Sequence, residues 1–193
     1  MKNDIILAGV GGQGILSIAA TIGMAALEKN LYMKQSEVHG MSQRGGAVES
    51  HLRISDKPIA SDLIPKGQAG LILSVEPMES LRYLPYLAPD GWLVTNSKPF
   101  INIPDYPEYE DLMAEIQKVE NHIIIDADQV AVDAGNKLAS NIVMLGAASP
   151  YIGLDFEAFE NSIRSIFAKK GDRIIQTNLD ALKAGREIST EKA

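Results

Sequence analysis

A glycine-rich turn between a buried strand and a helix constrains the fold of this chain more than any other feature. Residues 5–8 form a continuous apolar run, which is typical of a strand buried on both faces of a parallel sheet. Residues 9–14 follow with the spacing G-x-G-x-x-G, and residues 14–29 carry helix formers with apolar side chains at helical spacing. Such glycines permit a tight turn, let the backbone approach a ligand and bring the helix close to the sheet. The chain is therefore expected to begin with a strand–turn–helix unit.

The residues Gly11, Gly12, Gln13 and Gly14 of this turn are compatible with three roles. The glycines can serve close packing alone, or the free N–H groups at the helix start can bind an anion, such as a phosphate of coenzyme A. A nicotinamide dinucleotide site would need an acidic residue near the end of the second strand, and Glu37 has that position. However, Glu37 opens a polar segment, and little chain remains for the substrate domain of a dehydrogenase. The dinucleotide is therefore the least favoured of the three.

A second glycine-rich polar segment follows the next expected strand. Residues 31–38 predict a partly exposed strand, and residues 39–46 then have the sequence His-Gly-Met-Ser-Gln-Arg-Gly-Gly. Arg44 can pair with a carboxylate or phosphate through two hydrogen bonds, and His39 can titrate near neutral pH. Because the segment lies where α/β proteins form ligand clefts, His39, Gln43 and Arg44 are candidates for cofactor-facing or partner-facing contacts. An ordinary solvated loop is the alternative.

Residues 47–54 alternate between apolar and polar side chains. Alternation of this kind predicts a half-exposed strand at an antiparallel edge of the sheet. On this interpretation His51 points to solvent. Its spacing from His39 also does not fit a metal site.

The rest of the chain continues the alternation of strands and helices. Residues 71–75, 92–95 and 123–125 predict further buried strands, and a helix is expected to begin near Pro77. From residue 129 onward the chain is expected to be mostly helical, with a last helix that ends near Gly185. These patterns predict an α/β fold: a mostly parallel, Rossmann-like, three-layer sheet with an antiparallel edge and a helical C-terminal end. Residues 1–193 are expected to form one domain.

The composition limits the chemistry of the chain. It contains no cysteine, so its residues form no disulfide and cannot ligate an iron–sulfur cluster or zinc ion through thiolates. A net charge of -7 argues against a nucleic-acid partner. No apolar run approaches the roughly 18 residues that span a bilayer. A cytoplasmic protein without a membrane partner or a bound metal is expected.

Several other polar residues follow expected strands. Glu76 is expected to complement the dipole of a helix start, and Asp126 and Asp128 are expected to cap a helix, although either could face a cleft. The proline- and tyrosine-rich residues 99–109 have no evident role in a core. They are interpreted either as a partner contact or as a covered loop.

The two motifs and their surroundings resemble one known family. Residues 9–14, residues 36–46, the segment from Leu73 through Glu76-Pro77 and residues 84–87 together resemble, in order, the gamma-type domain of 2-oxoacid:ferredoxin oxidoreductases. The match extends over nearly the whole chain. The version of residues 39–46 found here is similar to that of the small subunit of the indolepyruvate type. Pyruvate and branched-chain types more often carry a Tyr-Gly-Pro-Glu version.

This resemblance implies a subunit that is inactive alone. Enzymes of the family decarboxylate a 2-oxoacid oxidatively, pass electrons to ferredoxin and form an acyl-CoA with coenzyme A as co-substrate. The resemblance implies that thiamine diphosphate and the iron–sulfur clusters belong to a large partner subunit, that this chain alone holds no cofactor, and that none of its residues is catalytic. Two other hypotheses stay open: a self-sufficient NAD(P)-linked enzyme and a CoA- or nucleotide-binding module.

Overall fold

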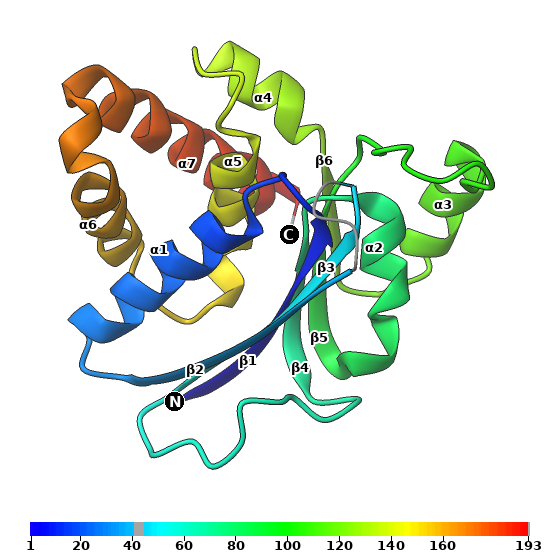
Figure 1. Ribbon diagram of the computed structural model, residues 1–193, viewed down its shortest axis with the longest axis horizontal. Coiled ribbons are helices and arrows are strands. Elements are labelled where there is room, and N and C mark those ends of the chain that lie inside the picture. Colours follow the sequence, from blue (N-terminus) through cyan, green and yellow to red (C-terminus); the bar gives the residue numbers. More distant parts are fainter. Residues whose placement is uncertain (41–44, 193) are drawn as a thin grey trace.

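The computed structural model describes residues 1–40 and 45–192, which form a six-stranded sheet with helices on both faces (Figure 1). The strands are β1 (Lys2–Val10), β2 (Tyr32–His39), β3 (Ala47–Ser55), β4 (Ala69–Ser74), β5 (Leu87–Asn96) and β6 (His122–Ile125). Their order across the sheet is β2-β3-β1-β4-β5-β6. The pairs β1–β4, β4–β5 and β5–β6 are parallel, whereas β3 is antiparallel to both β1 and β2. The predicted mostly parallel sheet with an antiparallel side is confirmed.

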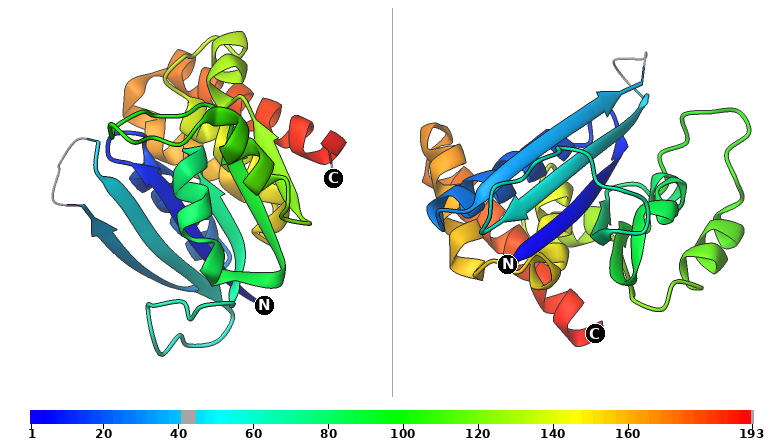
Figure 2. Two further views of the ribbon diagram at one scale, coloured as in Figure 1. Left: turned by 90° about the vertical axis from the view of Figure 1, so that its right-hand side faces the viewer. Right: turned by 90° about the horizontal axis from the view of Figure 1, so that it is seen from below.

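The helices form two layers of unequal size (Figure 2). The larger layer contains α1 (Ile15–Glu28), α4 (Ala127–Asp133), α5 (Ser140–Ala148), α6 (Phe156–Phe167) and α7 (Asp172–Lys192). The opposite face carries α2 (Pro77–Arg82) and α3 (Tyr109–Ile116). The predicted three layers, the helix start at Pro77 and the helical C-terminal end are confirmed. None of the helices in the described part of the chain is long and apolar enough to cross a membrane.

The position of β1 between two helical layers explains why its side chains are apolar without alternation. Ile5 and Leu7 pack into the cluster beneath the larger helical layer, whereas Ile6 and Ala8 pack into the cluster beneath α2 and α3. All four side chains have no exposed surface. A strand between two helical layers must be apolar on both faces, so a continuous run is required there.

The prediction that residues 47–54 form an edge strand is wrong, as is the solvent-facing orientation of His51. Strand β3 lies between β2 and β1, and the loop of residues 56–68 covers its polar face. His51 is only 5% exposed, its Nδ1 accepts from the Ile64 N–H at 2.9 Å, and its Nε2 lies 2.7 Å from the carboxylate of Glu49. Since Nδ1 is an acceptor, Nε2 carries the proton that the carboxylate receives. Alternation showed only that one face is polar, not that water covers it.

Arg53 holds the same loop to the sheet. Its Nε and Nη2 donate to the two carboxylate oxygens of the buried Asp4, at 2.8 and 3.0 Å, and its Nη1 donates to the carbonyls of Ser61 and Leu63. A two-pronged pair of this kind satisfies a buried carboxylate and fixes its geometry. The loop of residues 56–68 is therefore fastened to the end of the sheet where β1 begins.

Helix α7 does not end near Gly185 as predicted, because this glycine serves a helix contact. A Cβ on Gly185 would lie 2.0 Å from the carbonyl oxygen of Val143 in α5, and a Cβ on Gly146 would lie 2.0 Å from that of Leu182 in α7. The two helices thus approach each other backbone to backbone. Helix α7 continues to Lys192.

We expect Gly185→Ala to lower the free energy of unfolding by about 1–3 kcal/mol, because the added methyl group overpacks the contact between α5 and α7. Glycine to alanine inside a helix otherwise stabilises by roughly 0.5–1 kcal/mol, so the sign is diagnostic. Gly23→Ala in α1 is the matched control, since its Cβ would meet the movable side chain of Met33. Urea unfolding measures both, and a Gly185→Ala protein as stable as the control would contradict the packing.

Candidate functional site

The candidate site lies at the carboxyl ends of the parallel strands. Four segments meet there: the glycine turn of residues 9–14, the end of β2, the start of β3, and residues 97–108 between β5 and α3, here called the connector. Ligands of open α/β sheets bind at this end, where loops rather than strands form the surface. The structure brings the glycine turn and His39 together at this end, as the strand pattern predicted; their role as contacts to a ligand or partner stays a prediction.

The glycines of the turn have two different tasks. Gly9 and Gly14 are packing positions: a Cβ would lie 2.4 Å from the Val75 side chain in the first case and 2.5 Å from that of Asn141 in the second. Gly14 also has a φ of +83°, which disfavours any other residue. Gly12 has a φ of +101° but faces open space, with no heavy atom within 4 Å of an added Cβ. Gly9 and Gly14 therefore serve close packing, whereas Gly12 leaves the space beside the turn open.

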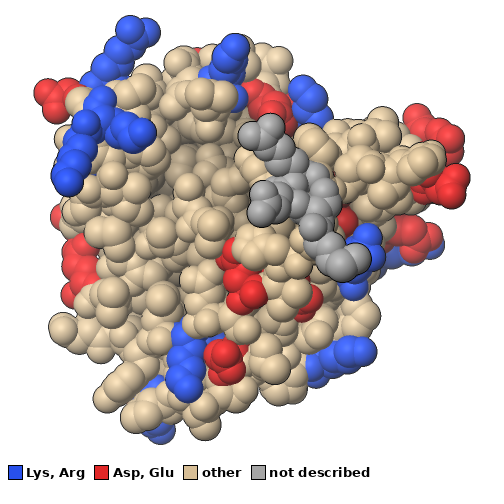
Figure 3. Space-filling view, viewed as in Figure 1, with Lys and Arg blue, Asp and Glu red and all other residues tan. Residues whose placement is uncertain are grey.

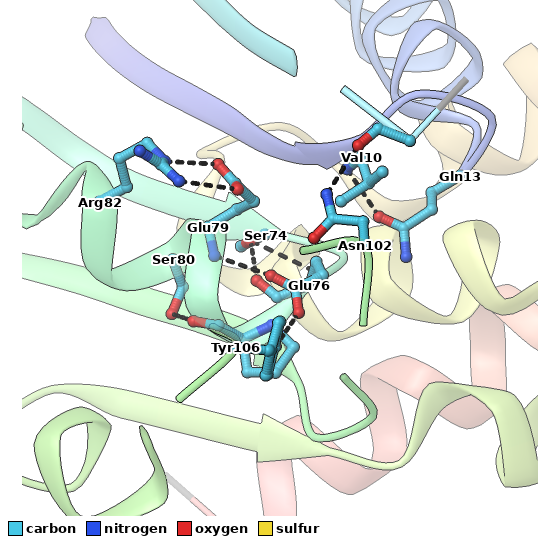
Figure 4. Close-up of polar contacts among 11 residues, drawn as sticks. Val10, Gln13, Ser74, Glu76, Glu79, Ser80, Arg82, Asn102 and Tyr106 are labelled. Carbon is cyan, nitrogen blue, oxygen red and sulfur yellow. Dashed lines mark hydrogen bonds and ion pairs between the residues drawn. The ribbon is translucent and has the colours of Figure 1, made fainter. Parts of the chain in front are cut away.

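Gln13 fastens the turn to the neighbouring strands. Its Oε1 accepts from the Val10 N–H at 2.7 Å (Figure 4). Its Nε2 lies 3.5 Å from the Val75 carbonyl just after β4. The Gly11 N–H donates to the carbonyl of Gly46 at 2.9 Å, which joins the turn to the start of β3. The side chain of Gln13 is thus engaged within the protein. Gly12 is the part of the turn that remains open.

Two cavities flank the start of α1. The first, of about 500 Å³, lies toward α5 and α7, and Lys137 and Lys170 line it together with Gly12. None of its described lining residues is acidic. Figure 3 shows basic side chains at the top of this face, including the region over the turn between α6 and α7. The arrangement offers positive charge and backbone donors to an anion.

The second cavity, of about 340 Å³, lies toward β2 and contains Glu37 and His39. The carboxylate of Glu37 contacts Nε2 of His39 and accepts from Gln35 at 3.2 Å. His39 is otherwise largely exposed. The predicted proximity of Glu37 to the glycine turn is present, but its oxygens already have partners. The other two predicted residues, Gln43 and Arg44, lie outside the described residues.

A buried carboxylate organises the opposite side of the site. Glu76 has no exposed surface and caps α2 by accepting from the Glu79 N–H at 2.8 Å. Its other oxygen accepts from the Phe100 N–H at 3.2 Å and from the hydroxyl of Tyr106 (Figure 4). Asn102 then donates to the Gly45 carbonyl at 2.6 Å. The predicted helix-start role of Glu76 is confirmed, and its attachment to the connector is new.

The acidic residues after β6 have structural roles. Asp126 caps α4 by accepting from the Gln129 N–H at 2.9 Å, and Asp128 accepts from Asn96 at 3.0 Å. Sequence reasoning missed Asn96, whose Oδ1 also receives the Ala127 N–H at 3.1 Å. Its position as the last residue of a buried strand was the available signal. Within residues 1–40 and 45–192, no group of three or more acidic or histidine side chains is arranged to hold a metal ion.

Burial raises the pKa of three ionisable groups near Glu76. It raises the pKa of Tyr83 to about 12, and burial together with the bond to Glu76 raises the pKa of Tyr106 still further. Burial also raises the pKa of Glu79, against the opposing effect of its ion pair with Arg82 at 2.9 Å. All three groups lie around α2.

We expect the free energy of unfolding to fall at high pH because the phenols of Tyr83 and Tyr106 ionise more readily in the unfolded chain. Folding raises both phenol pKa values above the unfolded value of about 10, so their stabilising effect is complete below that pH. It is lost as the pH rises through the folded pKa, about 12 for Tyr83. Unfolding by urea between about pH 7 and pH 12 measures this dependence, and the decline should begin near the unfolded pKa of about 10.

Tyr106→Phe should lower the free energy of unfolding at pH 7 by about 1–2 kcal/mol, because Glu76 loses one donor, and should flatten the alkaline decline. Tyr32→Phe at the exposed start of β2 is the control and should change neither. An alkaline profile of Tyr106→Phe that parallels the unchanged protein would contradict this assignment.

Comparisons with known proteins show the family to which this chain belongs. The family model described as pyruvate ferredoxin/flavodoxin oxidoreductase matches residues 4–188. Indolepyruvate oxidoreductase subunit IorB of Archaeoglobus fulgidus is 37% identical, over 96% of this chain and 94% of that protein. Ketoisovalerate oxidoreductase subunit VorA of Methanothermobacter marburgensis is 31% identical, over 94% of this chain but 35% of that protein.

Two solved structures share the fold. The gamma subunit of a keto/oxoacid ferredoxin oxidoreductase from Geobacter sulfurreducens superposes with a TM-score of 0.74 at 24% identity, over 98% of this chain and 99% of that one. The 2-oxoglutarate:ferredoxin oxidoreductase of Magnetococcus marinus, solved with coenzyme A bound, gives 0.78 at 19% identity, over 98% of this chain and 31% of that one. The fold, the extent of the family match and the identity to IorB lead to one conclusion. This chain is a member of the pyruvate ferredoxin/flavodoxin oxidoreductase family.

Proposed function

We propose that this chain is the small subunit of a heteromeric 2-oxoacid:ferredoxin oxidoreductase of the indolepyruvate type. The observation that carries the proposal is the relationship to IorB, which extends over nearly the full length of both chains. VorA matches at lower identity and contains further sequence beyond the matched third. Both the identity and the length therefore favour the indolepyruvate type over the branched-chain type. The family match over residues 4–188 supports one domain.

The redox chemistry belongs, on this proposal, to a large partner subunit that holds thiamine diphosphate and iron–sulfur clusters and delivers electrons to ferredoxin. The absence of cysteine from this chain agrees, because such clusters are bound by thiolates. Thiamine diphosphate stabilises the carbanion that remains when a 2-oxoacid loses carbon dioxide. The residues of this chain contribute shape, hydrogen-bond donors and charge beside that centre.

Coenzyme A is the proposed ligand of the cavity beside the glycine turn. Its phosphates need backbone donors and cations, which Gly12, Lys137 and Lys170 supply at the start of α1. Gly11, Gln13 and Gly14 shape the turn, and His39, Gln43 and Arg44 remain proposed contacts to the ligand or partner. A stand-alone NAD(P) enzyme is less well supported, because Glu37 already engages His39 and Gln35.

The isolated chain should bind no thiamine diphosphate and reduce no ferredoxin. Mixed with its purified large partner subunit, it should restore indolepyruvate-dependent reduction of ferredoxin in proportion to the amount added. A large subunit that reaches full activity without this chain would overturn the proposal. Saturable binding of NADH by the isolated chain, measured by fluorescence, would favour the alternative.

Lys170→Gln should raise the KM for coenzyme A in the reconstituted enzyme about three- to tenfold, because one cation of the cavity is lost. Lys169→Gln is the matched control, since the neighbouring Lys169 is exposed but does not line the cavity. The kcat at saturating coenzyme A should stay unchanged in both. Equal KM values for the two variants would contradict the proposal that coenzyme A binds in this cavity.

A further inference from the structure

The connector exposes three large apolar side chains within four residues. Phe100 is 44% exposed, Ile101 72% and Ile103 42%. Single exposed apolar residues are common on proteins, but a contiguous group marks a surface that something else covers. Tyr109 at the start of α3, six residues after Ile103, is a fourth exposed large side chain with an apolar ring.

The protein holds this exposed group in a fixed position. Glu76 receives hydrogen bonds from the backbone N–H of Phe100, the first residue of the group, and from the hydroxyl of Tyr106, three residues after its end. Between them, Asn102 donates a hydrogen bond to the Gly45 carbonyl. Three prolines at positions 99, 104 and 107 further restrict the backbone. A fully buried carboxylate is costly to place in an apolar interior unless donors surround it. Here it is used to fix a surface loop.

The connector also contains a polar atom without a partner. Oδ1 of Asn102 is buried and accepts no hydrogen bond, the single case among the buried side-chain nitrogen and oxygen atoms of the described residues. An unmade hydrogen bond of this kind costs about 1–3 kcal/mol. The exposed apolar group and the unsatisfied acceptor both fall within residues 100–103. Folding of the isolated chain explains neither.

Acidic residues outnumber basic ones beside the apolar group: four exposed acids follow it in the sequence, and one exposed lysine, Lys98, precedes it. Asp105, Glu108, Glu110 and Asp111 are all exposed, and none of them takes part in an ion pair with another described residue. Figure 3 shows the acidic side chains gathered where α3 projects from the body of the protein. The complementary surface would have an apolar centre and basic residues around it.

We propose that the connector is the docking surface for the large subunit of the oxidoreductase, which meets it with an apolar patch bordered by Lys and Arg. The inference rests on the proposed function and adds the contact surface to it. A second copy of this chain fits poorly, because a twofold contact would place this acidic patch against its own copy. A basic-bordered surface on a different chain has no such repulsion.

Two pairs of variants test the docking surface in titrations of this chain with the purified large subunit. Ile101→Ser should weaken binding about tenfold or more, mainly through faster dissociation, because it removes the most exposed apolar side chain of the patch. Leu63→Ser is its control, since Leu63 is 54% exposed in the loop at the opposite end of the sheet. Asp105→Lys should slow association and weaken the salt dependence of binding, whereas Asp62→Lys, in the loop of Leu63, should not.

The possible results distinguish a failure of the docking proposal from a failure of the proposed function. If all four variants unfold at the same temperature as the unaltered chain, weaker binding reflects a lost contact and not a lost fold. Any variant that unfolds is replaced by another substitution on the same surface that leaves the chain folded. If the unaltered chain binds and restores activity while Ile101→Ser and Asp105→Lys bind equally well, the docking surface is overturned and the function stands. If the unaltered chain binds no large subunit, both are overturned. Sedimentation of the chain alone, with a dimer lost only in Ile101→Ser, would assign the surface to a second copy.

Discussion

A carboxylate with no exposed surface must be surrounded by donors, and the carboxyl end of this sheet is arranged around one such group. Glu76 takes donors from the first turn of α2 and from two points of the connector, which are far apart in the chain. Because Val75 precedes it and packs against Gly9, the same short stretch also sets how closely the glycine turn approaches β4. The positions of the turn and the connector are therefore linked through two adjacent residues.

Much of this could be predicted from the sequence because it depends on local pattern. The apolar runs of β1, β4 and β6, the proline at the start of α2 and the glycines of the first turn each specify structure within a few residues. The placement of ligand-facing loops at the carboxyl end follows from the topology of a parallel sheet. The separate tasks of Gly9 and Gly12 do not follow, since the sequence does not show that Val75 lies opposite Gly9 while Gly12 faces open space.

The features that sequence reasoning missed depend on distant segments. The polar face of β3 is buried only because Arg53 and His51 find partners in Asp4 and in the loop of residues 56–68. Gly185 resembled a helix end and instead allows α7 to contact α5. Patterns among neighbouring residues cannot reveal such pairings, because the role of a glycine or histidine depends on which distant segment packs against it. Asp126 was predicted correctly, since its partner Gln129 is three residues away.

The net charge of -7 conceals a separation of charge around the glycine turn. Toward α5 and α7 the site is lined by Lys137 and Lys170, whereas the apolar centre of the connector lies among four exposed acidic residues of the connector and α3 and a single lysine, Lys98. An anionic ligand and a basic surface of a partner can therefore approach the same end of the sheet from different sides. Because each region repels what the other attracts, the proposed ligand contact and the proposed partner contact would not compete for one surface.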